Sequence, residues 1–237
     1  MAHVVANDVV VEFPIYGATS RSLKTTLLHA ATGGHLGRDA GHRVVVRALN
    51  SLSFEFSEGD RVGIIGHNGS GKSTLLRVLA GAYEPVSGSI KVVGRIASML
   101  SISLGMDMEA TGYENIYLRG AVMALNPQQI DSLVDEICDF SGLGEYIDMP
   151  MRTYSTGMAM RLAFAISTSV AADIILMDEW LSAGDASFSE KAQGRLARLL
   201  DQAKILVLAT HDEGLIRSTC NRILQLDHGD LVKFAPL

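Results

Sequence analysis

The sequence predicts an α/β fold in which a mostly parallel sheet is interrupted by a helical segment. Two apolar stretches, IILMD (174–178) and ILVLA (205–209), have the length of buried strands, and a helical pattern separates them. A third such strand precedes the glycine-rich segment GHNGSGKST (66–74), which leads into another helix. Strands that alternate with helices are typical of a parallel sheet. From about 110 to 172 the pattern turns helical, which predicts a helical subdomain inserted into the sheet.

The N-terminal part predicts antiparallel strands and an insertion. Residues 4–13 are apolar and β-branched, as expected of a strand. Residues 17–43 are rich in Gly, His, Thr and Ser, with a short helical patch around Leu23, Leu27 and Leu28. We interpret them as an insertion that carries a small amphipathic helix; a disordered loop is the alternative.

The segments around the glycine-rich loop follow in order. RVGIIG (61–66) predicts a buried strand, and KSTLLRVLAG (72–81) predicts a helix that Gly81 ends. Residues 89–100 predict further strand around Gly94.

In the helical segment, Asn126 and Pro127 form an N-cap and N1 pair, with Gln129 at N3. The apolar side chains that follow fall on one helix face: Ile130, Leu133, Val134, Ile137 and Cys138. Near the C-terminus, Asp227-His228-Gly229-Asp230 predicts a hairpin turn between two last strands.

Composition limits the function classes. The 237 residues are 48% hydrophobic, enough for a single domain over 1–237 with a subdomain. The net charge of −6 does not favour a nucleic-acid partner. The two cysteines have no metal-binding spacing, which indicates a reducing compartment. The most apolar long stretch, 159–177, contains Arg161 and Asp173, so we expect no transmembrane helix.

The segment 66–74 matches G-x-x-x-x-G-K-[ST], and its place between a strand and a helix argues against a chance glycine-rich turn. Gly66, Gly69 and Gly71 let backbone N–H groups surround a phosphate chain, Lys72 supplies positive charge, and Ser73 can bind Mg²⁺. The motif therefore predicts a nucleoside triphosphate site, and the other residues expected to contact the nucleotide are His67, Asn68, Ser70 and Thr74.

Acidic residues end the next buried strand. Asp178 is placed to hold Mg²⁺, and Glu179 can polarise the water that attacks the γ-phosphate. His211 follows the strand 205–209, at the end of the sheet where α/β folds bind ligands. A solvated surface histidine is the alternative for His211.

A second helix start lies in TYSTGMAMRL (153–162), where Ser155, Thr156 and Gly157 precede an apolar helical run. The free N–H groups of such a start form an anion site. Together, GHNGSGKST, YSTGM, IILMDE and His211 resemble, in this order, the nucleotide-binding subunit of an ABC transporter over nearly the whole chain.

That resemblance implies a P-loop NTPase of the ABC type. It implies that Ser155, Thr156, Gly157 and Met158 are the signature sequence, which caps the ATP held by a second copy. The expected assembly is a head-to-tail homodimer that encloses two nucleotides and hydrolyses ATP only when closed.

The exact residues of several motifs indicate which branch of the ABC transporter family the chain resembles. TGYENIYLRG (111–120), YSTGMAMRLAF (154–164), DEWLSAGDASF (178–188) and the FPIYG…RSLK segment (13–24) resemble the ATPases that export lipid-linked polysaccharides such as O-antigens, capsules and teichoic acids. The resemblance implies two copies of a multi-span permease as partners, and a peripheral location at the cytoplasmic face of the inner membrane.

The chain departs from the family pattern in places. No glutamine occurs between 84 and 127, and the usual Q-loop glutamine falls near Ser101 by count. Thr156 and Met158 replace the usual Gly and Gln of the signature. The C-terminal carbohydrate-binding domain of some relatives has no room in this chain.

For stacking on adenine, Tyr16 is the first candidate and Phe13 the second; ordinary core positions are the alternative for both.

Three other functions compete with polysaccharide export. One is an ABC transporter subunit for another cargo, such as a drug or lipid, against which the motif spellings argue. Another is an ABC ATPase of DNA repair or translation, which needs a long coiled coil or two tandem cassettes. The last is a P-loop kinase or GTPase, which leaves YSTGM unexplained and lacks the guanine-reading N-K-x-D.

Overall fold

The computed structural model describes residues 1–15, 35–38, 44–100, 102–179 and 186–237. The chain divides into two compact units. The first comprises Met1–Ile96, Asp173–Trp180 and Lys204–Leu237, and the second comprises Ala97–Ala172 and Leu181–Ala203. Each unit has its own core, so the two are described separately.

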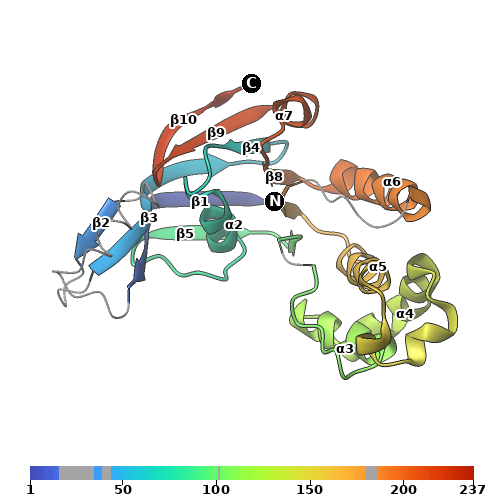
Figure 1. Ribbon diagram of the computed structural model, residues 1–237. Coiled ribbons are helices and arrows are strands. Elements are labelled where there is room, and N and C mark those ends of the chain that lie inside the picture. Colours follow the sequence, from blue (N-terminus) through green and yellow to red (C-terminus); the bar gives the residue numbers. More distant parts are fainter. Residues whose placement is uncertain (16–34, 39–43, 101, 180–185) are drawn as a thin grey trace. The chain divides into compact units, whose positions relative to one another are not determined.

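The first unit contains a four-stranded antiparallel sheet in the order β2-β3-β1-β5 (Figure 1). Its strands are β1 (His3–Pro14), β2 (His35–Arg38), β3 (Val44–Phe56) and β5 (Ser87–Val93). In β1, Val4, Ala6, Val9 and Val11 are buried while the residues between them are more exposed. This alternation gives the sheet one apolar face, and it confirms the N-terminal strand that the sequence predicts.

A second sheet has the order β10-β9-β4-β8-β7-β6. Its strands are β4 (Arg61–Ile65), β6 (Ile96–Ser98), β7 (Ile174–Asp178), β8 (Ile205–Ala209), β9 (Arg222–Asp227) and β10 (Asp230–Pro236). The strands β7, β8, β4 and β9 run parallel, and β10 returns antiparallel to β9. Every residue of β8 is buried, as expected of a strand covered on both faces.

Two helices accompany this sheet in the first unit: α2 (Lys72–Leu79) and α7 (Glu213–Thr219). The helix α2 contacts β7 and β8, and it buries Leu75, Leu76 and Leu79. Gly81, with φ 73°, follows the end of α2 and donates its N–H to the Val78 carbonyl at 3.0 Å. Gly94, with φ 123°, lies between β5 and β6. Both glycines therefore lie where the sequence predicts them.

The second unit is helical. It contains α3 (Gly112–Val122), α4 (Pro127–Ser141), α5 (Thr156–Ser167) and α6 (Ala186–Gln202), with the 3₁₀ turns η1 (Gly144–Asp148) and η2 (Met151–Thr153). Asn126 and Gln129 form the predicted capping box of α4, each side chain accepting the other residue's N–H at 2.9 Å. Grouping α6 with these helices is a feature that the sequence analysis did not anticipate.

Aromatic packing joins three helices of the second unit. The rings of Phe140 in α4, Phe164 in α5 and Phe188 in α6 have centroids 5.6 to 6.1 Å apart. Arg195 of α6 lies over the Phe140 ring at 4.2 Å, and its guanidinium donates to Glu136 and to the Thr168 carbonyl. This buried arginine thus ties the end of α5 to α4 and α6.

In the parts of the chain that the structure describes, no helix combines the length and apolar character needed to span a membrane. The amphipathic helix expected within 17–43, the adenine-stacking candidate Tyr16 and the Q-loop position Ser101 lie outside the described residues.

Candidate functional site

The glycine-rich segment 66–74, named the phosphate loop for its predicted role, runs from the end of β4 into the first turn of α2 in the first unit. Gly66, Gly69 and Gly71 have φ angles of 153°, 84° and 105°. A Cβ on Gly66 would lie 2.3 Å from the Leu226 carbonyl oxygen, and one on Gly71 would lie 2.7 Å from that of Ala48. Glycine is required at both positions by conformation and by close contact.

Lys72 lies inside this loop. Its ammonium donates to the carbonyls of Gly66 at 2.7 Å and His67 at 3.0 Å, and the side chain is buried. Burial lowers the pKa of Lys72, while the nearby carboxylates Asp178 and Glu179 act in the opposite direction. A partly desolvated ammonium next to the N-terminus of α2 attracts an anion strongly, because little water screens it.

The acidic strand end reaches the same loop. Ser73 Oγ donates to Asp178 Oδ2 at 2.6 Å. A serine hydroxyl and a carboxylate are both oxygen ligands of the kind that Mg²⁺ prefers. These two residues, 105 positions apart in the sequence, form the donor pair that the sequence predicts.

Two further features fit a polyphosphate at this loop. By helical geometry, the first N–H groups of α2 have no acceptor inside the helix. Ser70 Oγ is fully buried, and no atom of the described residues pairs with it. The loop therefore combines unpaired donors with the positive charge of Lys72.

Glu179 and His211 follow two adjacent parallel strands. The strands β7 and β8 are paired with Asp178 opposite Ala209, and the Glu179 N–H donates to the Ala209 carbonyl at 2.7 Å. Glu179 has φ 65°, an unusual conformation for a non-glycine residue, and both Glu179 and His211 are exposed. Both predicted catalytic residues thus lie at the carboxyl edge of the sheet, the edge that also carries the phosphate loop.

The second predicted anion site is the start of α5 in the other unit. Ser155 caps the helix by accepting the Met158 N–H at 3.2 Å, and Ser155 and Thr156 are exposed. A Cβ on Gly157 would meet only Ser155 Oγ, at 3.9 Å. The face at Gly157 is therefore accessible to a ligand.

Of the adenine-stacking candidates, only Phe13 is described. It is 37% exposed and packs edge-on against Tyr83, with ring centroids 5.3 Å apart. One residue pair near the loop escaped the sequence analysis: Asp227 and His228, which were recognised only as turn residues, lie beside His67. Nothing local in the sequence links these two segments.

Comparison with known proteins agrees with this geometry. The family model described as ABC transporter matches residues 49–182. The O-antigen export system ATP-binding protein RfbE of Yersinia enterocolitica is 44% identical over 97% of this chain and 96% of its own length.

The chain belongs to the ABC transporter family. It is an ATPase of that family.

Other relatives of this ABC subunit are longer. The O-antigen export system ATP-binding protein RfbB of Myxococcus xanthus is 40% identical over 88% of this chain, which spans 47% of that protein. The teichoic acids export ATP-binding protein TagH of Bacillus anthracis is 38% identical over 80% of this chain, which spans 34% of that protein. A solved dimeric ATP-binding cassette in a post-hydrolysis state, bound to ADP and Pi, has a TM-score of 0.68 over 99% of this chain and 98% of its own, at 20% identity. That likeness shows the fold.

The close packing of the phosphate loop yields a stability prediction. Replacing Gly71 by Ala forces a Cβ against the Ala48 carbonyl, and we expect it to lower the free energy of unfolding by about 2–4 kcal/mol. Gly81 is the matched control, because its φ is also positive but nothing lies within 4 Å of an added Cβ. Gly81→Ala should cost about 1 kcal/mol from its conformation alone.

Urea unfolding of both variants, followed by circular dichroism, measures the difference. Equal losses for the two variants would contradict the close approach of Gly71 to β3.

Proposed function

We propose that the chain is the ATP-hydrolysing motor of an exporter that moves a lipid-linked polysaccharide, such as an O-antigen, across the cytoplasmic membrane. The observation that carries this proposal is the 44% identity, over nearly the full length of both chains, to an O-antigen export ATP-binding protein. The similarity to teichoic acid export proteins supports the same class of cargo.

In this proposal the phosphate loop holds MgATP. The N–H groups of the loop and of the first turn of α2 bind the phosphates, and Lys72 neutralises their charge. Ser73 and Asp178 hold Mg²⁺, directly or through water. The metal supplies positive charge where the leaving oxygens become negative. The 2.6 Å contact between Ser73 and Asp178 supports this assignment, because both donors already converge.

Glu179 orients the attacking water and accepts a proton from it as the water attacks. The carboxylate follows Asp178 directly and is exposed at the carboxyl edge of the sheet, which also carries the phosphate loop. His211, at the end of β8, donates a hydrogen bond toward the γ-phosphate. The parallel pairing of β7 with β8 supports both roles, since it places the two residues at neighbouring strand ends.

A second copy completes the site. The exposed start of α5, with Ser155 as its cap and an open face at Gly157, is suited to bind the γ-phosphate held by the partner chain. The proposed assembly is a head-to-tail homodimer with two composite sites. Hydrolysis then depends on closure of the dimer, and opening and closing can move another protein.

That other protein is a membrane permease, present in two copies, so the chain works at the cytoplasmic face of the membrane. A groove of about 670 Å³ in the second unit supports a docking site for one of its segments. Residues of α3 and of the segment before it line this groove, and three of them are acidic: Asp107, Glu109, Ala110, Tyr113, Glu114, Tyr117, Leu118 and Ala121. Tyr113 and Leu118 are exposed there and offer apolar contact area to a partner.

The role of Glu179 predicts the behaviour of one variant. Glu179→Gln should retain ATP binding and lose about 10²-fold or more of its turnover, because the amide cannot accept the proton of the attacking water. Phosphate release gives the turnover, and a fluorescent ATP analogue gives the affinity. Glu213→Gln is the control, since Glu213 is exposed in the first turn of α7 and should retain the parent rate. Turnover of Glu179→Gln within a few-fold of the parent would remove Glu179 from this role.

The cargo is tested in the organism that carries the chain. We expect deletion of the gene to remove polysaccharide from the cell surface, to leave lipid-linked polysaccharide inside, and to be rescued by the parent chain but not by Lys72→Ala. An impermeant lectin on intact and on permeabilised cells distinguishes the two pools. Normal surface polysaccharide together with lost efflux of a lipid or drug would favour the alternative cargo.

A further inference from the structure

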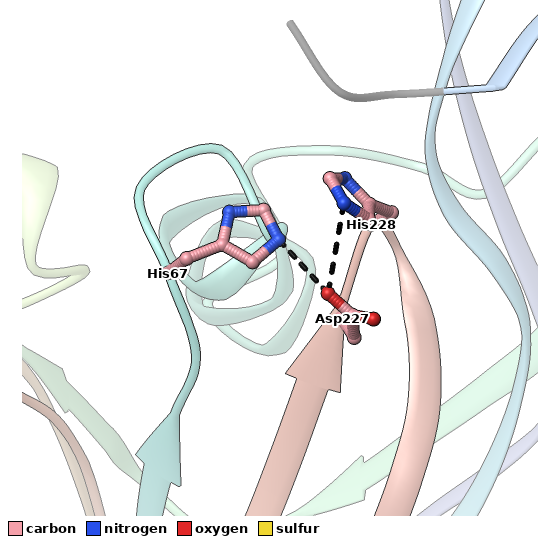
Figure 2. Close-up of side chains that lie close together, drawn as sticks. All are labelled: His67, Asp227 and His228. Atoms are coloured by element: carbon pink, nitrogen blue, oxygen red, sulfur yellow. Dashed lines mark hydrogen bonds and ion pairs between the residues drawn. The ribbon is translucent and has the colours of Figure 1, made fainter.

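Two histidines and an aspartate converge beside the phosphate loop (Figure 2). His67 belongs to the loop, whereas Asp227 and His228 come from the turn between β9 and β10. All three lie in the first unit, and one ligand atom of each lies within 4.8 Å of the other two. His67 Nε2 is 3.0 Å and His228 Nε2 is 3.8 Å from the same oxygen, Asp227 Oδ1.

The hydrogen-bond pattern of His67 leaves a lone pair facing the carboxylate. Its Nδ1 lies 2.7 Å from the Asn68 carbonyl oxygen, which can only accept, so Nδ1 carries the proton. In the neutral ring Nε2 is then unprotonated, yet it faces Asp227 Oδ1, which is also only an acceptor when ionised. A positive charge between these two atoms is needed to make their 3.0 Å separation favourable.

The position of His228 indicates that the positive charge between His67 and Asp227 is a metal ion rather than a proton. A proton on His67 Nε2 would satisfy only the His67–Asp227 contact. The 3.8 Å between His228 Nε2 and Asp227 Oδ1 is too long for a hydrogen bond, but both imidazoles still point their Nε2 atoms toward one oxygen. A metal ion bound to all three atoms would satisfy these three atoms together, while His228 Nδ1 is buried and pairs with no atom of the described residues.

The turn explains how His228 reaches this position. His228 has φ 48° and Gly229 has φ 88°, the two positive values of a type I′ hairpin turn. The Gly229 N–H donates to the Ser70 carbonyl at 3.0 Å, so the turn is already fastened to the phosphate loop. Asp227 and His228 therefore face His67 on a fixed backbone and not on a free loop.

We propose that His67 Nε2, Asp227 Oδ1 and His228 Nε2 form a site for one divalent transition-metal ion, with Zn²⁺ as the best fit. Two imidazole nitrogens and one carboxylate oxygen are a common zinc ligand set, with water in the fourth position. Bonds of about 2.0–2.1 Å in a tetrahedron place ligand atoms about 3.3 Å apart. The two nitrogen–oxygen separations are 3.0 and 3.8 Å, and the two nitrogens lie within 4.8 Å of each other, so small side-chain adjustments bring all three atoms onto one ion. The bond from Nδ1 to the Asn68 carbonyl is the outer contact that orients a metal-binding histidine.

This site differs in chemistry from the proposed Mg²⁺ pair. Ser73 and Asp178 offer oxygen alone, which suits Mg²⁺, whereas two imidazoles favour Zn²⁺ over Mg²⁺. Zinc bound at this site would add a second link between the β9–β10 turn and the phosphate loop, next to the Gly229–Ser70 hydrogen bond. Occupancy should therefore restrain the loop that has to close on phosphate.

The full chain, freed of metal and without nucleotide, is titrated with ZnCl₂ by calorimetry and with CoCl₂ by visible absorption. We expect one equivalent to bind, with the intense cobalt bands of a tetrahedral site. Asp227→Asn and His228→Asn should each weaken binding at least about tenfold, as loss of a ligand does. Asparagine is chosen at 228 because it tolerates positive φ. Zinc should also slow amide exchange at residues 66–70 of the parent chain and not of the two variants.

Asp178→Asn is the control, because it damages the oxygen pair and leaves the proposed zinc ligands intact. Its zinc affinity should match that of the parent chain. Binding that is lost in Asp178→Asn but kept in Asp227→Asn and His228→Asn would overturn the proposal, as would the absence of stoichiometric binding in the parent chain. A thermal midpoint equal to the parent's in EDTA shows that each variant is folded.

Discussion

The close packing of the phosphate loop against its neighbours is the constraint on which the rest of the structure depends. Positions 66 and 71 have no room for a Cβ, because the carbonyls of Leu226 and Ala48 lie against them. These neighbours come from β9 and β3, so the loop is held by both sheets of the first unit. Since β4 lies between β8 and β9 in the parallel sheet, the ends of β7 and β8 are also fixed near the loop. The Ser73–Asp178 contact is the chemical result of that strand order.

Much of this arrangement could be predicted from sequence, because its signals are local. The strand before Gly66, the helix from Lys72, the capping box at Asn126 and the turn at 227–230 each depend on a few neighbouring residues, and all four are present. The Ser73–Asp178 pair also followed, because the carboxyl ends of parallel strands share an edge. The packing of α6 with the helical unit, and the approach of His228 to His67, depend on contacts between distant segments. No local pattern encodes such contacts.

Two helix starts of different construction carry the proposed chemistry. The helix α2 starts at Gly71 in a left-handed conformation with no side-chain cap, so its N–H groups remain available to phosphate. The helix α5 starts at Ser155, whose side chain occupies only the Met158 N–H. The two starts lie in different units, and the account requires the second to serve the nucleotide of another copy. In the proposed mechanism, dimer closure, ATP hydrolysis and permease movement are one coupled process.

The central claim is that each active site takes its phosphate loop from one chain and its α5 start from the other. The most direct test is a mixed dimer of one Lys72→Ala chain and one Gly157→Asp chain, purified by two different tags. The aspartate brings negative charge and bulk to the face that should meet the γ-phosphate. If the sites are composite, both lesions fall in one site, the other site stays intact, and a single-turnover experiment should show one site's worth of bound, slowly hydrolysed ATP. If each chain uses its own α5 start, both sites are damaged, and the absence of any hydrolysis would contradict the account.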